Sequence, residues 1–121
     1  MRAAPAPLVF DRRQILSLSD GDKAFTRTLL TRLMQTNRSD IRALLASHAA
    51  GSAPAVAARA HRIRGGCSIV GAGRVAAQAL LLESHLEAHG LDARSGRAAW
   101  RLARRILELE RALLAWLASL R

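Results

Sequence analysis

Hydrophobic positions recur every three or four residues along most of the chain, which is the spacing of amphipathic helices. The pattern predicts four long helices, at about residues 23–47, 54–70, 73–89 and 97–120. A shorter apolar stretch between Leu8 and Leu18 predicts a lead-in helix that packs onto the others. Four amphipathic helices joined by short loops predict an all-α fold, an antiparallel four-helix bundle with a short N-terminal lead-in helix.

Residues that cap or end helices lie at most of these boundaries. The run Ser19–Asp22 can accept hydrogen bonds from the free amides of the first long helix. Ser52 is a suitable N-cap and Pro54 fits the first turn of the next helix. Gly90 suits a C-cap. We therefore expect Leu91–Gly96 to be a loop that leads into the last helix.

The polar run Asn37–Asp40 interrupts the first long apolar pattern. This segment is either one long helix with a kink or two helices in line. The predicted core comprises the apolar stripes of the three later helices: Val56, Ile63, Cys67, Val70, Val75, Leu81, Leu82, Leu86, Leu102, Ile106, Leu109, Leu113, Trp116, Leu117 and Leu120.

Length and composition agree with one helical domain. The 121 residues are 50% hydrophobic but only 3% aromatic, which is typical of aliphatic helix packing. The single cysteine cannot form an internal disulfide, so nothing indicates an oxidising compartment. No apolar run approaches the roughly 18 residues of a membrane span. We expect residues 1–7 to form a flexible leader, residues 8–121 to form the domain, and the chain to be cytoplasmic without direct membrane contact.

The chain is strongly basic, with a formal net charge of +10, and all but one of its 19 basic residues are arginine. Because the arginines are spread along the chain, solvated helix faces account for many of them. The charge also suits steering toward an acidic protein partner. Nucleic-acid binding is less well supported, because base-stacking aromatics and a DNA-reading motif are missing from the sequence.

The segment Ala60–Ser68 contains the most informative pattern. On a helix, the residues within about 40° of His61 are all small, and we expect them to form a docking face: Ala57, Gly65, Ser68 and Ala72. Arg64 lies about 60° away and places a guanidinium beside the imidazole. Two successive glycines in mid-helix cost about 1 kcal/mol each relative to alanine. The pattern indicates that a second protein approaches His61 and that the transferred group is anionic.

This pattern resembles the phosphoacceptor signature of histidine-containing phosphotransfer (HPt) domains. The matching residues are His61-x-Ile63-Arg64-Gly65-Gly66, followed by Val70-Gly71-Ala72. Arg64 stands where the family usually has lysine, and Ile63 where it usually has leucine. Weaker matches are Phe10-Asp11, Asp20-Gly21-Asp22 and Leu82-Glu83, so that the resemblance covers about residues 8–118.

The resemblance implies a phosphorelay intermediate. His61 would accept a phosphoryl group from a receiver-domain aspartate and pass it to another receiver. The ring nitrogen is nucleophilic near neutral pH, and Arg64 would favour the neutral ring and pair with phosphoryl oxygens.

We expect no metal or cofactor in this chain, with Mg²⁺ supplied by the response-regulator receiver. We expect no autonomous kinase activity. The module would belong to the C-terminus of a hybrid sensor histidine kinase, the cytoplasmic end of an inner-membrane sensor. A monomer is expected because the bundle is complete without a second chain.

Two alternatives remain from the sequence. In the dimerisation domain of a histidine kinase, Glu or Asp directly follows the histidine, whereas Arg62 stands here. A basic helical module that binds protein or nucleic acid would not need His61.

We interpret His48, His85 and His89 as surface or terminal residues. The carboxylates of Glu83 and Glu87 are expected to be solvated.

Overall fold

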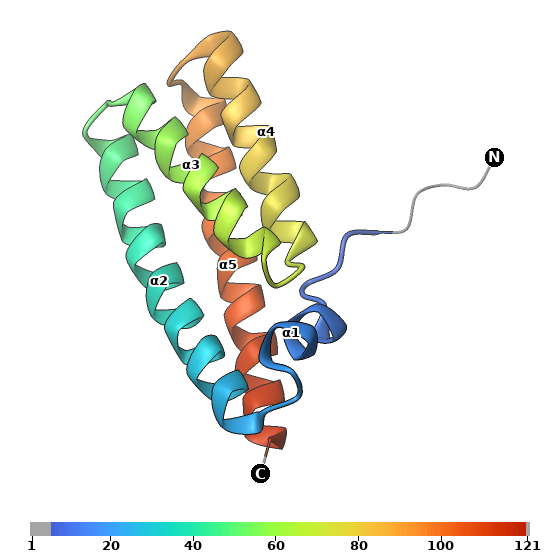
Figure 1. Ribbon diagram of the computed structural model, residues 1–121. Helices are drawn as coiled ribbons and strands as arrows, with labels where there is room; N and C mark the ends of the chain where they lie inside the picture. The colour runs from blue at the N-terminus through green and yellow to red at the C-terminus, as the bar shows by residue number, and fades with distance from the viewer. Residues whose placement is uncertain (1–5, 121) are drawn as a thin grey trace, which may run out of the picture.

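The computed structural model describes residues 6–120, and every regular element in this part of the chain is an α-helix (Figure 1). The helices are α1 (Arg12–Ser19), α2 (Lys23–Ala49), α3 (Ala53–Ser68), α4 (Gly73–His89) and α5 (Ala93–Ser119). The predicted all-α fold with a short lead-in helix is confirmed. Of the predicted leader, residues 1–5 lie outside the described residues, and Ala6 and Pro7 precede the first helix.

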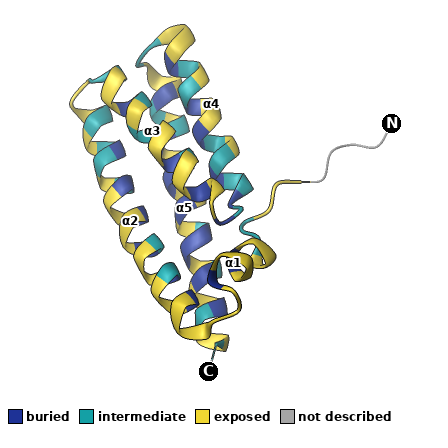
Figure 2. Ribbon diagram, viewed as in Figure 1, coloured by how far each residue is buried: buried dark blue, intermediate teal, exposed yellow. Residues whose placement is uncertain are grey.

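The four long helices form a closed ring in which α2 packs on α3, α3 on α4, α4 on α5 and α5 on α2. The inward faces are buried and the outward faces are exposed (Figure 2). Most of the predicted core positions are buried, but Leu81 is 63% exposed and Leu117 and Leu120 are only half-buried. The prediction for Leu81 was wrong because its neighbour Leu82 points inward, and adjacent helical residues lie about 100° apart. None of the helices within residues 6–120 is long and apolar enough to cross a membrane.

Helix α2 runs without a break through Asn37–Asp40. Asn37 and Asp40 are both buried, so these polar residues face the neighbouring helix. The Asp40 carboxylate accepts a hydrogen bond of 2.9 Å from Arg59 on α3. The alternative of two helices in line is therefore wrong, and the polar run supplies contacts between α2 and α3.

Helix α5 begins at Ala93, four residues earlier than predicted, so the expectation of a loop over Leu91–Gly96 was wrong. The reason is a capping box. The Asp92 carboxylate accepts from the Ser95 amide at 2.8 Å, and the Ser95 hydroxyl accepts from the Asp92 amide at 2.8 Å. These reciprocal bonds satisfy two donors that are otherwise free at a helix start.

Helix α1 lies below the turn between α3 and α4 in Figure 1 and caps the C-terminus of α3. The Gln14 side chain donates to the carbonyl oxygens of Ser68 and Ile69, at 2.8 and 2.6 Å. These carbonyls lack partners within the helix because α3 ends at Ser68, two residues before the predicted end. Gly71 follows with φ +68°, and a Cβ there would lie 2.6 Å from the Asp11 Cβ. Only glycine fits this turn.

Candidate functional site

His61 lies in the middle of α3 on the outer surface of the bundle, with its side chain 71% exposed. The face of α3 that points into the bundle carries other residues. Among them are Ala60 and Ile63, which flank His61 in the sequence and are buried. This burial fixes the rotation of the helix about its axis and leaves the imidazole in solvent. The prediction that His61 is exposed is confirmed.

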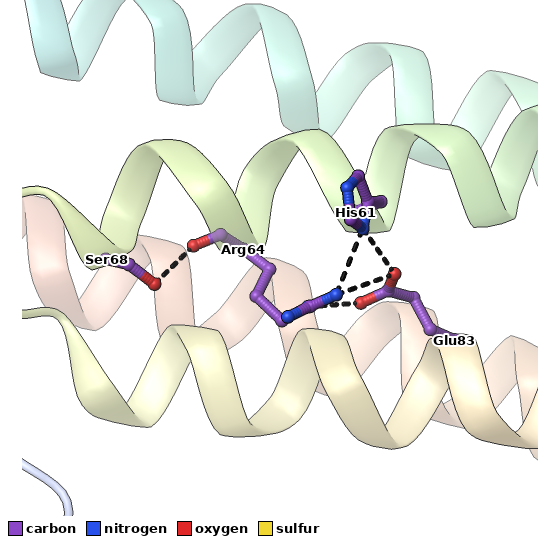
Figure 3. Close-up of polar contacts among 4 residues, drawn as sticks. All are labelled: His61, Arg64, Ser68 and Glu83. Carbon is purple, nitrogen blue, oxygen red and sulfur yellow. Dashed lines mark hydrogen bonds and ion pairs between the residues drawn. The ribbon is translucent and has the colours of Figure 1, made fainter.

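Three side chains meet at the imidazole: His61 and Arg64 from α3, and Glu83 from α4 (Figure 3). The Nδ1 atom of His61 lies 3.0 Å from Oε1 of Glu83. Arg64 Nε donates to Glu83 Oε2 at 2.6 Å, and Arg64 Nη2 lies 3.4 Å from Glu83 Oε1. Arg64 Nη2 also lies 3.0 Å from His61 Nδ1. Glu83 is thus shared between the histidine and the arginine.

The Glu83 contact determines which nitrogen of His61 can act as a nucleophile. An ionised carboxylate only accepts hydrogen bonds, so its contact with Nδ1 requires a proton on Nδ1. In this tautomer Nε2 carries the lone pair, and Nε2 has no hydrogen-bond partner among the described residues. The approach of Arg64 to Nδ1 is a hydrogen bond only in the opposite tautomer. Because Arg64 is already bonded to both Glu83 oxygens, the tautomer with Nδ1 protonated satisfies more groups.

The electrostatics of the pair keep Glu83 ionised. Burial of this carboxyl acts to raise its pKa, but hydrogen bonds from Arg64 and His61 outweigh burial and hold the pKa below its ordinary value of 4.5. The hydrogen bond to Glu83 in turn raises the pKa of Arg64. The carboxylate is therefore available near neutral pH to accept a hydrogen bond from the Nδ1–H group and to stabilise positive charge on the ring.

The small residues expected around His61 differ in their surroundings. Gly65 is exposed, and a Cβ added to Gly65 or Gly66 would meet nothing within 4 Å, so neither glycine is required by packing. Ser68 is exposed, and its hydroxyl donates to the Arg64 carbonyl at 2.7 Å (Figure 3). Ala57 is half-buried one turn before His61. These three residues are compatible with a docking face.

Ala72 does not belong to this face. It is 0% exposed and occupies the N-cap position of α4. Helical spacing placed Ala72 beside His61, but α3 ends at Ser68 and the spacing does not continue through the turn. The prediction that Ala72 contacts a partner was wrong.

Glu83 was expected to be solvated and is instead the principal contact of both His61 and Arg64. Its side chain is only 17% exposed. The one signal in the sequence was its place in the Leu82-Glu83 pair that resembles the family. The contact joins residues 22 positions apart on two helices, and their relative register is set by packing. Arg64 is bound to Glu83 and also contacts His61 at Nδ1, the same ring nitrogen that Glu83 contacts.

The remaining cysteine and histidines of the described chain have other surroundings. Within residues 6–120, no group of three or more His, Cys, Asp or Glu side chains could hold a metal ion. Burial raises the pKa of the Cys67 thiol to about 12, so it stays protonated. His48 lies 3.2 Å from the Ser95 hydroxyl and His85 lies 2.7 Å from Asp92, so both histidines make contacts at the start of α5.

The fold and this histidine site define the class of protein. A family model described as "Hpt domain" matches residues 28–119, and the chain belongs to this family of phosphorelay proteins, which interact with receiver domains. It is similar to the virulence sensor protein BvgS of Bordetella bronchiseptica, with 40% identity over 86 residues, and to BvgS of Bordetella pertussis, with 37%. Each match covers 67% of this chain and only 7% of BvgS. The crystal structure of histidine-containing phosphotransfer protein B (HptB) from Pseudomonas aeruginosa PAO1 has a TM-score of 0.83, at 23% identity, over 96% of this chain and 100% of HptB. That likeness supports the fold.

Proposed function

We propose that this protein is a phosphorelay intermediate in which Nε2 of His61 carries the phosphoryl group. Its donor and acceptor are the aspartates of two receiver domains. The main structural support for this assignment is the exposed imidazole, whose Nδ1 is held by Glu83 and whose Nε2 has no partner in residues 6–120. Membership of the Hpt family supports the same role.

The transfer step follows from the tautomer. The Nε2 lone pair attacks the phosphorus of an aspartyl phosphate, the N–P bond forms, and the bond from phosphorus to the aspartate oxygen breaks. The aspartate leaves as a carboxylate. The ring keeps its Nδ1 proton and becomes a cation, which the Glu83 carboxylate stabilises. In the second transfer a carboxylate oxygen of the acceptor aspartate attacks the phosphorus, a new O–P bond forms, the N–P bond breaks, and the neutral imidazole is the leaving group.

The chain contributes the nucleophile and its support, and the receiver contributes the rest of the chemistry. The Mg²⁺ and the acidic pocket that neutralise phosphoryl charge would belong to the receiver. The receiver would lie against Gly65, Ser68 and Ala57. Arg64 would release Glu83 and then pair with the phosphoryl oxygens. We also propose that the chain acts as a monomer in the cytoplasm.

The likeness to BvgS supports a further proposal about the parent protein. The chain spans only 7% of the length of the BvgS proteins that it matches. We propose that it is the C-terminal phosphotransfer module of a hybrid sensor histidine kinase, and that kinase activity lies in other parts of that protein.

The test is phosphotransfer from purified receiver domains charged with radiolabelled acetyl phosphate. We expect label to move to this chain in an acid-labile, alkali-stable bond. His61→Gln should abolish the transfer without changing helicity by circular dichroism. Transfer that survives this substitution would contradict the assignment.

A further inference from the structure

The outward face of α5 carries a second pattern that the phosphotransfer site does not use. Apolar and arginine side chains alternate at spacings of four and three residues: Trp100, Arg104, Leu107, Arg111 and Leu114. These five positions lie within about 40° of one direction on a helix. We call them the α5 stripe. The core residues of α5, such as Leu102, Ile106 and Leu109, lie on the opposite side.

The apolar members of the α5 stripe are unusually exposed for such large side chains. Trp100 is 62% exposed, Leu107 49% and Leu114 46%. The spacing of four and three residues is the spacing of a coiled-coil seam, where each apolar side chain packs between residues of a facing helix. The stripe therefore has the geometry to receive a helix along its length.

A groove of about 930 Å³ runs beside the stripe, between α5 and Gln78 of α4. A smaller groove of about 310 Å³ continues it past Leu81 and Arg74. Leu81, 63% exposed, adds apolar surface there. The exposed position of Leu81, which the sequence pattern had placed in the core, thus belongs to this surface.

The charges of the groove indicate the chemistry of its partner. Its carboxylate, Glu108, is already paired with Arg74 at 2.9 Å and with Arg105 at 3.2 Å. Three further arginines line the groove without a carboxylate partner in the described part of the chain: Arg101, Arg104 and Arg111. Like charges one turn apart destabilise a helix. The surplus positive charge is complementary to an acidic ligand.

We propose that the α5 stripe and its groove bind an acidic amphipathic helix of a partner protein. Leucine-like side chains of that helix would pack against Trp100, Leu107 and Leu114, and its carboxylates would pair with Arg104 and Arg111. A second copy of this chain is a poorer occupant, because it would place arginines against arginines. Nucleic acid is also poorer, because phosphates would pair with the arginines and leave the apolar side chains uncovered.

Binding at this surface leaves the phosphotransfer site free. Glu83 on α4 reaches His61 on α3, whereas Gln78 and Leu81 leave α4 on the side of α5. A partner helix could thus hold this domain in a complex while His61 exchanges its phosphoryl group with a receiver. The proposal does not depend on phosphotransfer at His61.

A designed peptide tests the surface directly. The probe is a fluorescein-labelled peptide of about 21 residues, with leucine at the a and d positions and glutamate at e and g, whose charge prevents self-association. We expect saturable binding in fluorescence anisotropy with the complete chain. Emission of Trp100 should shift to shorter wavelength, and Trp100→Phe should remove this shift. A peptide of the same composition in scrambled order, and one with lysine in place of glutamate, should not bind.

Substitutions distinguish a helix site from a general basic surface. Arg104→Glu with Arg111→Glu should weaken binding by about tenfold or more, and Leu107→Ser by about tenfold. Arg32 is an exposed arginine on α2. Arg32→Glu is therefore the matched control, and it should change affinity less than about twofold. Circular dichroism checks that each variant is folded. Absence of peptide binding, or binding that Leu107→Ser does not weaken, overturns the proposal. Binding of a DNA duplex as tight as that of the peptide, and insensitive to Leu107→Ser, also overturns it.

Discussion

The Nδ1 atom of His61 lies 3.0 Å from Oε1 of Glu83, across the interface between α3 and α4. This contact assigns different roles to the two ring nitrogens. Nδ1 is held by the protein, and Nε2 faces the solvent from which a partner approaches. The same carboxylate holds Arg64 at 2.6 Å, so one acidic side chain orders both residues of the phosphoacceptor motif.

Removal of the Glu83 charge should slow phosphotransfer. We expect Glu83→Gln, which keeps a hydrogen-bond acceptor for Nδ1, to slow transfer several-fold. Glu83→Ala, which loses the acceptor, should slow it about tenfold or more. Rapid-quench measurements with a phosphorylated receiver give these rates. Glu87 is an exposed carboxylate one turn further along α4, and Glu87→Gln is the matched control. If Glu83→Ala transferred at the unmodified rate, Glu83 would have no part in the step.

Arg64 should affect both transfer and the lifetime of the phosphorylated state. We expect Arg64→Ala to slow transfer about tenfold and to shorten the half-life of the phosphohistidine, because Glu83 is then no longer oriented and the phosphoryl group loses a cation. Arg64→Lys should restore most of the lifetime. Arg62→Ala serves as the control, because Arg62 is exposed and its Nε lies 3.9 Å from Asp40 Oδ1 on α2. Equal rates and half-lives for Arg64→Ala and the unmodified chain would remove Arg64 from the mechanism.

The two adjacent glycines provide a matched pair for the docking face. A Cβ added at Gly65 or Gly66 would meet nothing within 4 Å, so neither glycine lies against another part of the described chain. Alanine at either position should stabilise the domain by about 1 kcal/mol in urea unfolding. Gly65→Leu places bulk about 40° from His61, whereas Gly66→Leu places it about 140° away.

We therefore expect Gly65→Leu to weaken receiver binding by about tenfold, with Gly66→Leu close to the unmodified chain. Isothermal titration with a receiver domain measures both affinities. Equal affinities for the two leucine variants would show that the surface beside His61 is not the docking face.

Acid should weaken the contact between the helices at Glu83. The folded-state pKa of this carboxyl lies below its ordinary value of 4.5. At pH values between these two pKa values, the unfolded chain therefore binds more protons than the folded chain. The stabilisation is thus complete above the ordinary value and is lost as the pH falls through the folded-state pKa.

The corresponding measurement is urea unfolding between about pH 6 and pH 3. The free energy of unfolding of Glu83→Gln should depend less on pH than that of the unmodified chain, whereas Glu87→Gln should keep the original dependence. An unchanged pH dependence in Glu83→Gln would mean that the carboxylate does not contribute to stability in this way.

The sequence predicted the helices and the exposed histidine because both depend on local spacing. The apolar stripe of α3 determines which face is buried, and His61 lies away from that stripe. Features that depend on contacts between helices were missed. Glu83 is one example, since its role requires the register of α4 against α3. Ala72 was misplaced for a local reason, because the turn at Gly71 ended the helical spacing that had placed it beside His61. At α5, the capping box of Asp92 and Ser95 extended a helix into a segment that looked like a loop.

The most direct test of the account identifies the nitrogen that carries the phosphoryl group. Nuclear magnetic resonance of the phosphorylated chain, with isotope-labelled histidine, distinguishes phosphorylation at Nε2 from phosphorylation at Nδ1. We predict a single phosphohistidine, at residue 61, with the phosphorus on Nε2 and a proton retained on Nδ1. A phosphoryl group on Nδ1, or on a residue other than His61, would contradict the account.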